Sequence, residues 1–175
     1  MTAHGAAAID PTPRRNWLDP AWQDEVRVWA TDRLAGSGRT LTGALDPVRV
    51  RPWSAVFRAT TTTDRVWFKA NSAGSGYEAA LVEALAGWTP DAVLTPLAVD
   101  TARGWLLTAD AGPTMREALA ERPDPHRWEP MLTAYAGLQR ALVPHVDELV
   151  ALGVPDLRPA RLPTLLAGLL DDPQV

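Results

Sequence analysis

One lysine and one glutamate have residue types and spacing that could serve phosphate chemistry. Lys69 ends the run Val66-Trp67-Phe68-Lys69, whose β-branched and aromatic residues are typical of a strand. Glu78 follows near the start of a helical pattern. An ammonium group fixed by a carboxylate can make charge-assisted hydrogen bonds to phosphate oxygens. The two residues therefore suggest half of a nucleotide-phosphate site.

Each residue also has a purely structural interpretation. A lysine in a strand often protects a sheet edge from aggregation. A glutamate in the first helical turn stabilises the helix by roughly 0.3–1 kcal/mol through the dipole. The helical rotation of about 100° per residue favours the pair, because it puts Glu78 beside the apolar stripe of its helix and turns Glu83 away.

The turn between the first two expected strands would lie over the same ligand. It reads Pro52-Trp53-Ser54-Ala55 and has no glycine, so its backbone cannot cradle phosphate as a glycine-rich loop does. The Ser54 hydroxyl is a further candidate contact. Trp53 is expected to pack rather than to touch a ligand.

Periodicity gives the elements that must position these side chains. An N-cap and proline at Asp19-Pro20 begin a helix that the glycines at 36–38 end. Tight connections predict an antiparallel meander, because a parallel crossover needs a dozen or more residues. The expected strands are 48–53, 56–60 and 66–70, with a turn at 61–64, then a helix over 77–88 and a second hairpin of strands 93–99 and 104–108.

After Gly112-Pro113, which we interpret as a hinge, the pattern becomes helical. Thr114 and Glu117 form a capping box. A 3.6-residue period over 131–149 predicts a helix with a kink at Pro144, and the apolar helix at 161–170 suggests packing partners on residues not present here. The expected organisation is a loose leader at 1–16, a sheet-bearing lobe at 17–109, and the hinge with the start of an incomplete helical lobe at 110–175.

Composition narrows the function classes. The 175 residues, 46 % hydrophobic and 22 % charged, fit one ordinary domain without an apolar membrane span. The net charge of −4 is interspersed, which argues against nucleic-acid binding. The absence of cysteine fits a cytoplasmic location. The three histidines are too scattered for a metal site.

Six stretches of the chain together match the pattern of one known family: Val50-Arg51-Pro52-Trp53-Ser54, Val66-Trp67-Phe68-Lys69-Ala70, Tyr77-Glu78-Ala79-Ala80-Leu81, Pro96-Leu97-Ala98-Val99-Asp100, Arg103-Gly104-Trp105-Leu106-Leu107 and Leu152-Gly153-Val154-Pro155-Asp156-Leu157-Arg158-Pro159. With these stretches the chain resembles the aminoglycoside phosphotransferase family, and the similarity runs from about Trp22 to the end. The resemblance implies a protein-kinase-like fold: a five-stranded antiparallel sheet with one packed helix, then a hinge and the first helices of a truncated C-terminal lobe. It implies that Lys69 contacts the phosphates of ATP, that Glu78 pairs with Lys69, and that Thr108, Ala109 and Asp110 bind adenine through backbone groups. The activity implied is ATP-dependent phosphorylation of a hydroxyl on a small molecule.

The chain departs from the family at the catalytic loop. The family carries His-x-Asp, then Asn five residues later, then a magnesium-binding Asp. His145-Val146-Asp147 imitates the first part, but Leu152 occupies the Asn position and no asparagine follows Asn71. We interpret the match as a coincidence inside a helix. We therefore expect no catalytic residue or metal ligand in this chain, magnesium only in a full-length protein, and little activity without a C-terminal lobe in cis.

Two other interpretations remain. Gly74-Ser75-Gly76-Tyr77-Glu78-Ala79 spells the G-x-G-x-x-A turn of a dinucleotide-binding fold, which would require a parallel sheet. Alternatively, the chain is a non-catalytic nucleotide-binding or partner-binding module that resembles a pseudokinase. The downstream reading frame would separate a truncated enzyme from such a module.

Overall fold

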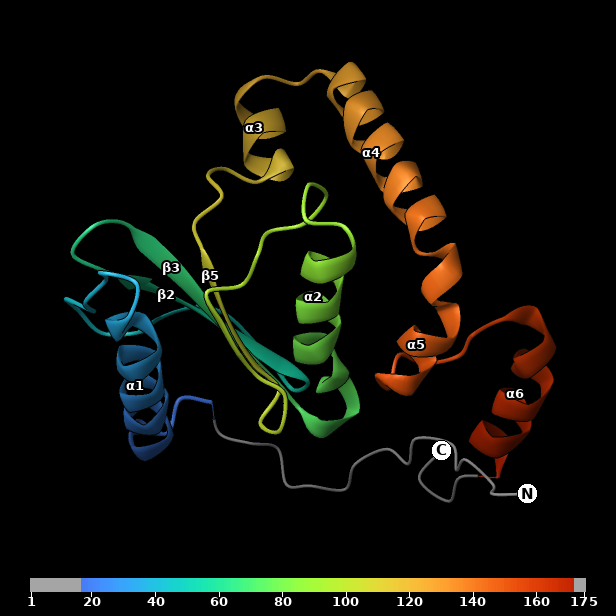
Figure 1. Ribbon diagram of the computed structural model, residues 1–175, viewed down its shortest axis with the longest axis horizontal. Helices are drawn as coiled ribbons and strands as arrows, with labels where there is room; N and C mark the ends of the chain where they lie inside the picture. The colour runs from blue at the N-terminus through green and yellow to red at the C-terminus, as the bar shows by residue number, and fades with distance from the viewer. Residues whose placement is uncertain (1–16, 172–175) are drawn as a thin grey trace.

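The computed structural model describes residues 17–171, so the expected leader at 1–16 lies outside the described residues. All the strands lie in the first part of the described chain, together with helices α1 and α2. The part that follows β5 contains only helices and 3₁₀ turns (Figure 1). In order, its elements are α1 Pro20–Ala35, β1 Asp46–Arg51, β2 Ser54–Thr60, β3 Arg65–Asn71, the 3₁₀ turn Ala73–Ser75, α2 Tyr77–Trp88, β4 Ala98–Asp100, β5 Trp105–Ala109, α3 Met115–Glu121, the 3₁₀ turn Pro125–Arg127, α4 Trp128–Ala141, the 3₁₀ turn Val143–His145, α5 Val146–Ala151, the 3₁₀ turn Pro159–Arg161 and α6 Leu162–Leu170.

The five strands form one antiparallel sheet in the order β1-β2-β3-β5-β4. This confirms the α+β class and the five-stranded antiparallel sheet expected from the sequence. β3 is central, with β2 on one side and β5 on the other. Lys69 is therefore not an edge-strand lysine. The dinucleotide-binding alternative is wrong as well, because both neighbours of β3 run antiparallel to it.

α1 packs on one face of the sheet and forms the main core with it. The Asp19 side chain caps its N-terminus by accepting from the Ala21 N–H. Five α1 residues are buried, among them Trp22 and Trp29, whose rings lie 6.2 Å and 6.0 Å from the ring of Phe68. The helix predicted from Asp19 to the glycines at 36–38 is confirmed, and its tryptophan stripe faces the sheet.

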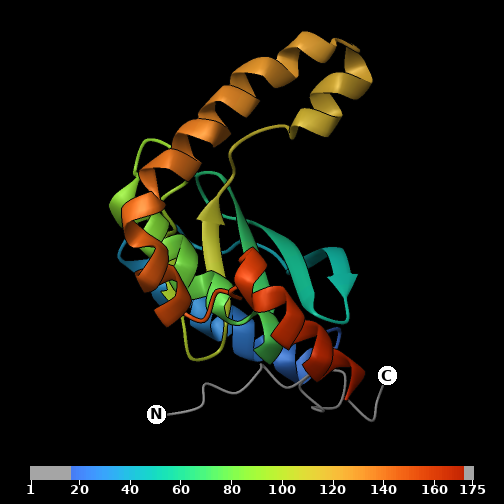
Figure 2. The ribbon, with the colours of Figure 1, turned by 90° about the vertical axis from the view of Figure 1, so that its right-hand side faces the viewer.

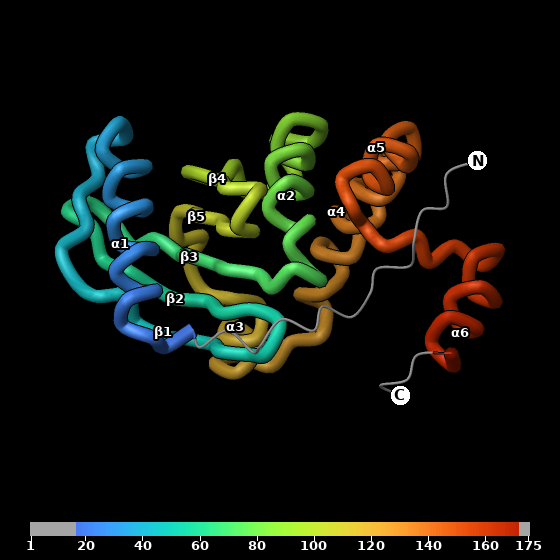
Figure 3. Tube along the Cα trace, turned by 90° about the horizontal axis from the view of Figure 1, so that it is seen from below, coloured from blue at the N-terminus to red at the C-terminus, as the bar shows by residue number. Residues whose placement is uncertain are grey.

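α2 lies on the other face, so the sheet is flanked by two helices, whereas the family resemblance implied one packed helix (Figures 1 and 3). Only Ala79 of this helix is fully buried. α2 contacts β4 at the edge of the sheet. α2 thus has one fully buried residue where α1 has five, and most of its other residues are half-buried.

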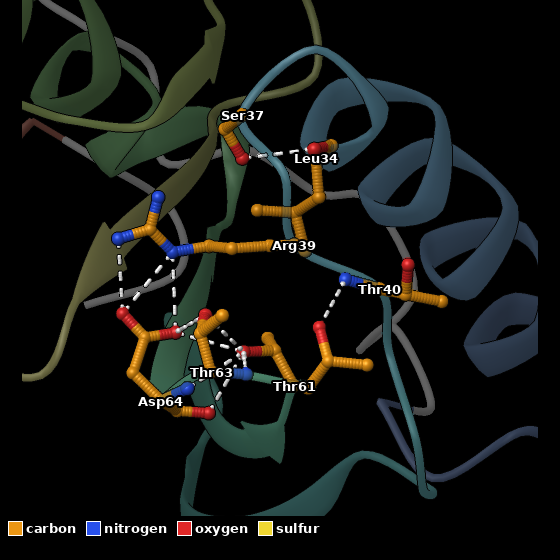
Figure 4. A network of polar contacts seen from close by, with 8 residues as sticks. Leu34, Ser37, Arg39, Thr40, Thr61, Thr63 and Asp64 are labelled. Atoms are coloured by element: carbon orange, nitrogen blue, oxygen red, sulfur yellow. Dashed lines mark hydrogen bonds and ion pairs between the residues drawn. The ribbon is translucent and has the colours of Figure 1, made fainter.

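A polar network ties the segment after α1 to the β2–β3 hairpin (Figure 4). The Arg39 guanidinium pairs with the Asp64 carboxylate at 2.9 Å. Asp64 also accepts from the Thr61 hydroxyl at 2.8 Å. The predicted turn at 61–64 is confirmed, and its polar side chains close it from within.

The second hairpin is shorter than predicted on its first strand. A strand was expected over 93–99, but β4 spans only Ala98–Asp100. Pro96 has no N–H and cannot donate to a sheet ladder. The segment before Leu97 therefore runs as a loop.

The helical half extends away from the sheet on the side of α2 (Figures 1 and 2). The capping box at Thr114 and Glu117 is confirmed, as is the interruption at Pro144, where α4 gives way to a 3₁₀ turn before α5. α6 has no fully buried residue. Within residues 17–171, no helix combines the length and apolar character needed to cross a bilayer.

Candidate functional site

Lys69 and Glu78 are joined as predicted. Lys69 Nζ lies 2.5 Å from Oε1 and 2.6 Å from Oε2 of Glu78, and each side chain is 30 % exposed. The ammonium has three N–H donors. The two carboxylate oxygens can engage two of them, so one remains for a ligand. Lys69 is the only lysine in the sequence.

The sheet and the start of α2 bring the pair together. Phe68 and Ala70 of β3 are buried on the α1 side, so alternation sends Lys69 to the α2 side. Glu78 stands in the first turn of α2. The β4–β5 turn supports that first turn, because a Cβ at Gly104 would lie 3.2 Å from Gly76 Cα. Gly104 has φ +66°, a conformation that favours glycine.

Ser54 lies in β2 and not in the β1–β2 turn, where it was predicted. Its register partners are Arg51 and Asn71, and it is only 8 % exposed. Ser54 and Asn71 lie on the Lys69 face of the sheet, since cross-strand partners share a face. The Asn71 Oδ1 is buried without a hydrogen-bond partner among the described residues. This oxygen is therefore an unused hydrogen-bond acceptor two residues after Lys69 in β3.

Trp53 is exposed at the β1–β2 turn and does not pack as predicted. Its carbonyl oxygen accepts from the Ser72 N–H at 2.8 Å and from the Ser75 hydroxyl at 3.1 Å. These bonds tie the turn to the loop that leads into α2. The turn therefore has a fixed position relative to the Lys69–Glu78 pair.

The three predicted adenine-binding residues lie at the end of β5. Thr108 pairs with Trp67, and the Asp110 N–H donates to the Arg65 carbonyl at 3.1 Å. By the alternation of an antiparallel ladder, the Ala109 N–H and C=O point away from β3. β4 pairing extends only to Leu107, so the Ala109 groups have no strand partner within residues 17–171. Of the three, Ala109 is the one whose backbone N–H and C=O both point away from β3 without a strand partner among the described residues.

The Asp110 side chain organises the chain as it leaves the sheet. It accepts from the Gly112 N–H at 3.0 Å and pairs with Arg65 at 2.8 Å. Hydrogen bonds from the Gly112 N–H and the Trp67 indole, together with the Arg65 charge, hold the pKa of Asp110 below its usual range. Gly112 has φ +85°, so a glycine is needed at this bend. The side chain of Asp110 serves the bend and is not free for a ligand.

The His145-Val146-Asp147 match lies in helical structure, as interpreted. His145 ends a 3₁₀ turn, stacks on Trp88 with ring centroids 4.2 Å apart, and contacts Glu148 at 3.0 Å. Asp147 is exposed on α5. The described residues contain no group of three histidine, cysteine or acidic side chains that could hold a metal ion.

Sequence reasoning missed two arginines that share the face of Lys69. Arg49 is the register partner of Val56, which is the partner of Lys69, and Arg51 is the partner of Ser54. The alternation in Val48-Arg49-Val50-Arg51 was a usable signal. Its relation to Lys69 depends, however, on a bulge between Pro47 and Arg49 that no local pattern indicates.

Comparison of this chain with protein-family models, with curated proteins and with solved structures finds no significant match.

Proposed function

We propose that this chain forms the ATP-binding sheet and hinge of a phosphotransferase that acts on a hydroxyl group of a small molecule. In this proposal the sheet with α2 is a protein-kinase-like N-terminal lobe, the bend at Asp110–Gly112 is the hinge, and the helices from α3 onward begin the C-terminal lobe. The proposed phosphate acceptor, a hydroxyl group of a small molecule, follows from the resemblance to aminoglycoside phosphotransferases. We propose no particular compound as the acceptor.

The observation that carries the proposal is the Lys69–Glu78 pair on the central strand. Lys69 lies in a central strand, so it cannot serve to keep a sheet edge from aggregating. Lysine is disfavoured in strands, so a charged residue here lowers the stability of the sheet unless it has a function. The carboxylate fixes the ammonium while leaving one N–H available. A positioned cation of this kind stabilises phosphate charge in phosphoryl transfer.

The end of β5 supports the nucleotide as ligand. Ala109 offers one N–H donor and one C=O acceptor at the point where β4 no longer pairs with β5. An adenine edge carries both an acceptor and a donor, so it can pair with such a backbone. Ala109 and Lys69 lie on adjacent strands, which suits a ligand with a base at one end and phosphates at the other.

Protection of the single lysine tests the proposal. Acylation of Lys69 by an amine-reactive ester, followed by mass spectrometry, should slow when ATP with magnesium is present. Adenosine at the same concentration should protect much less, because it lacks phosphates. Equal labelling of Lys69 with and without saturating ATP would contradict the proposal.

A non-catalytic nucleotide-binding module is the second candidate. It is favoured by Leu152 at the position where the family pattern would place asparagine and by the helical setting of His145 and Asp147. Both candidates predict protection of Lys69 by ATP. They differ in turnover: release of phosphate or transfer to an aminoglycoside or other hydroxyl compound by the longest expressible form of the protein would favour the enzyme.

A further inference from the structure

Arg49 and Arg51 occupy the sheet face that carries Lys69. Cross-strand partners share a face, and the register runs from Arg49 through Val56 to Lys69. Arg51 lies one row further toward the β1–β2 turn, opposite Ser54. β1 and β3 are two strand spacings apart, about 10 Å, so long side chains from both strands can meet one extended ligand.

Neither arginine is committed to a carboxylate within residues 17–171. The arginines that form ion pairs there are Arg39, Arg65, Arg103, Arg158 and Arg161. The side chains of Arg49 and Arg51 are exposed.

Helix α2 leaves this part of the sheet open. α2 contacts β4, which is one edge of the sheet, whereas β1 is the opposite edge (Figure 3). The half of the face that carries Arg49 and Arg51 is therefore not covered by α2, and a ligand can approach the arginines and Lys69 from the same side.

The charge on this face is unusual for the chain. The whole sequence has a net charge of −4, yet the α2 side of β1–β3 carries Arg49, Arg51, Arg58, Arg65 and Lys69. The acids aligned with them are Glu78, which pairs with Lys69, Asp110, which pairs with Arg65, and Asp46, which is the register partner of Arg58. Arg49 and Arg51 supply the excess positive charge.

We propose that Arg49 and Arg51 bind the polyphosphate chain of a nucleotide together with Lys69. The β1–β2 turn has no glycine and is tied down through the Trp53 carbonyl, so its backbone does not wrap around phosphates. Guanidinium groups bind phosphate oxygens in pairs of parallel hydrogen bonds. Side chains of β1 thus take the role that backbone N–H groups have in a glycine-rich loop. The nucleotide as ligand rests on the proposed function, whereas the polyphosphate chemistry rests on the charges.

Titration calorimetry with tripolyphosphate and with ATP, both without magnesium, tests this proposal. The variants are Arg49→Gln, Arg51→Gln and their combination. Arg27→Gln is the matched control, since Arg27 is exposed on α1 and forms no ion pair with a described residue. We expect the double variant to weaken tripolyphosphate binding about tenfold or more, as loss of charge-assisted hydrogen bonds predicts, and Arg27→Gln to change it less than about twofold.

The outcomes separate this proposal from the proposed function. Failure of the wild-type chain to bind tripolyphosphate, or an equal loss in Arg27→Gln and the double variant, would overturn the arginine site. ATP binding that depends on Lys69 but not on the arginines would overturn it and leave the nucleotide function standing. Arginine-dependent binding in which ATP is no tighter than tripolyphosphate would support the anion site and contradict the nucleotide function.

Discussion

The substitution Glu78→Gln tests whether the carboxylate of α2 holds Lys69. The two oxygens of Glu78 lie 2.5 Å and 2.6 Å from Nζ. Hydrogen bonds to charged groups contribute about 1.5–3 kcal/mol each in buried settings, but exposed ion pairs contribute about 0–1 kcal/mol. Both side chains are 30 % exposed, so we place the pairing free energy between these cases, at about 1–2 kcal/mol. That corresponds to roughly a 5- to 30-fold change in an equilibrium constant.

The acylation rate of Lys69 measures this change directly. The amine must leave the carboxylate before it can attack an electrophile, so Glu78→Gln should raise the rate roughly 5- to 30-fold. The α-amino group serves as an internal reference, since Lys69 is the only lysine. Glu83→Gln is the control, because Glu83 is exposed on the same helix. Equal Lys69 rates in the wild type and Glu78→Gln, with both folded by circular dichroism, would refute the pairing.

Three further predictions concern the scaffold. Phe68→Ala removes a ring that is 0 % exposed and should lower the free energy of unfolding by about 3–5 kcal/mol in urea denaturation; a loss below 1 kcal/mol would mean that the core is elsewhere. A double-mutant cycle of Trp88→Ala and His145→Ala should give a coupling free energy of about 0.5–1.5 kcal/mol, because the rings stack at 4.2 Å; additive effects would show that α2 and the 3₁₀ turn are independent. The Arg158 guanidinium lowers the pKa of Asp156 from 3.8 to about 2. The free energy of unfolding of the wild type should therefore exceed that of Asp156→Asn above pH 3.8, and this difference should disappear as the pH falls to about 2. A carboxyl NMR titration of Asp156 near 3.8 would contradict this pairing.

Local signals in the sequence were enough to place the central pair. Alternation in Val66–Lys69 sets the face of the lysine, and the helical stripe after Tyr77 sets the side of Glu78. Both are short-range patterns, and the structure joins the two side chains as they predict.

Pairing between distant segments could not be predicted in the same way. Nothing in β5 specifies that it inserts between β3 and β4, although this makes β3 central and leaves the outward backbone groups of Ala109 without a strand partner among the described residues. The bulge before Arg49 decides which face that arginine takes, and a one-residue shift of register would reverse it. Ser54 was predicted to lie in the turn but belongs to β2. Its pairing with Arg51 and Asn71 extends the strand to this residue, and local residue propensity does not show that pairing.

The central claim is that Lys69 is the phosphate contact of a nucleotide site. Its most direct test is titration calorimetry of ATP with magnesium against the wild-type chain and Lys69→Ala. We expect measurable binding by the wild type and a loss of about tenfold or more in Lys69→Ala, the effect of one charge-assisted hydrogen bond. Equal, measurable affinity in both proteins would contradict the claim.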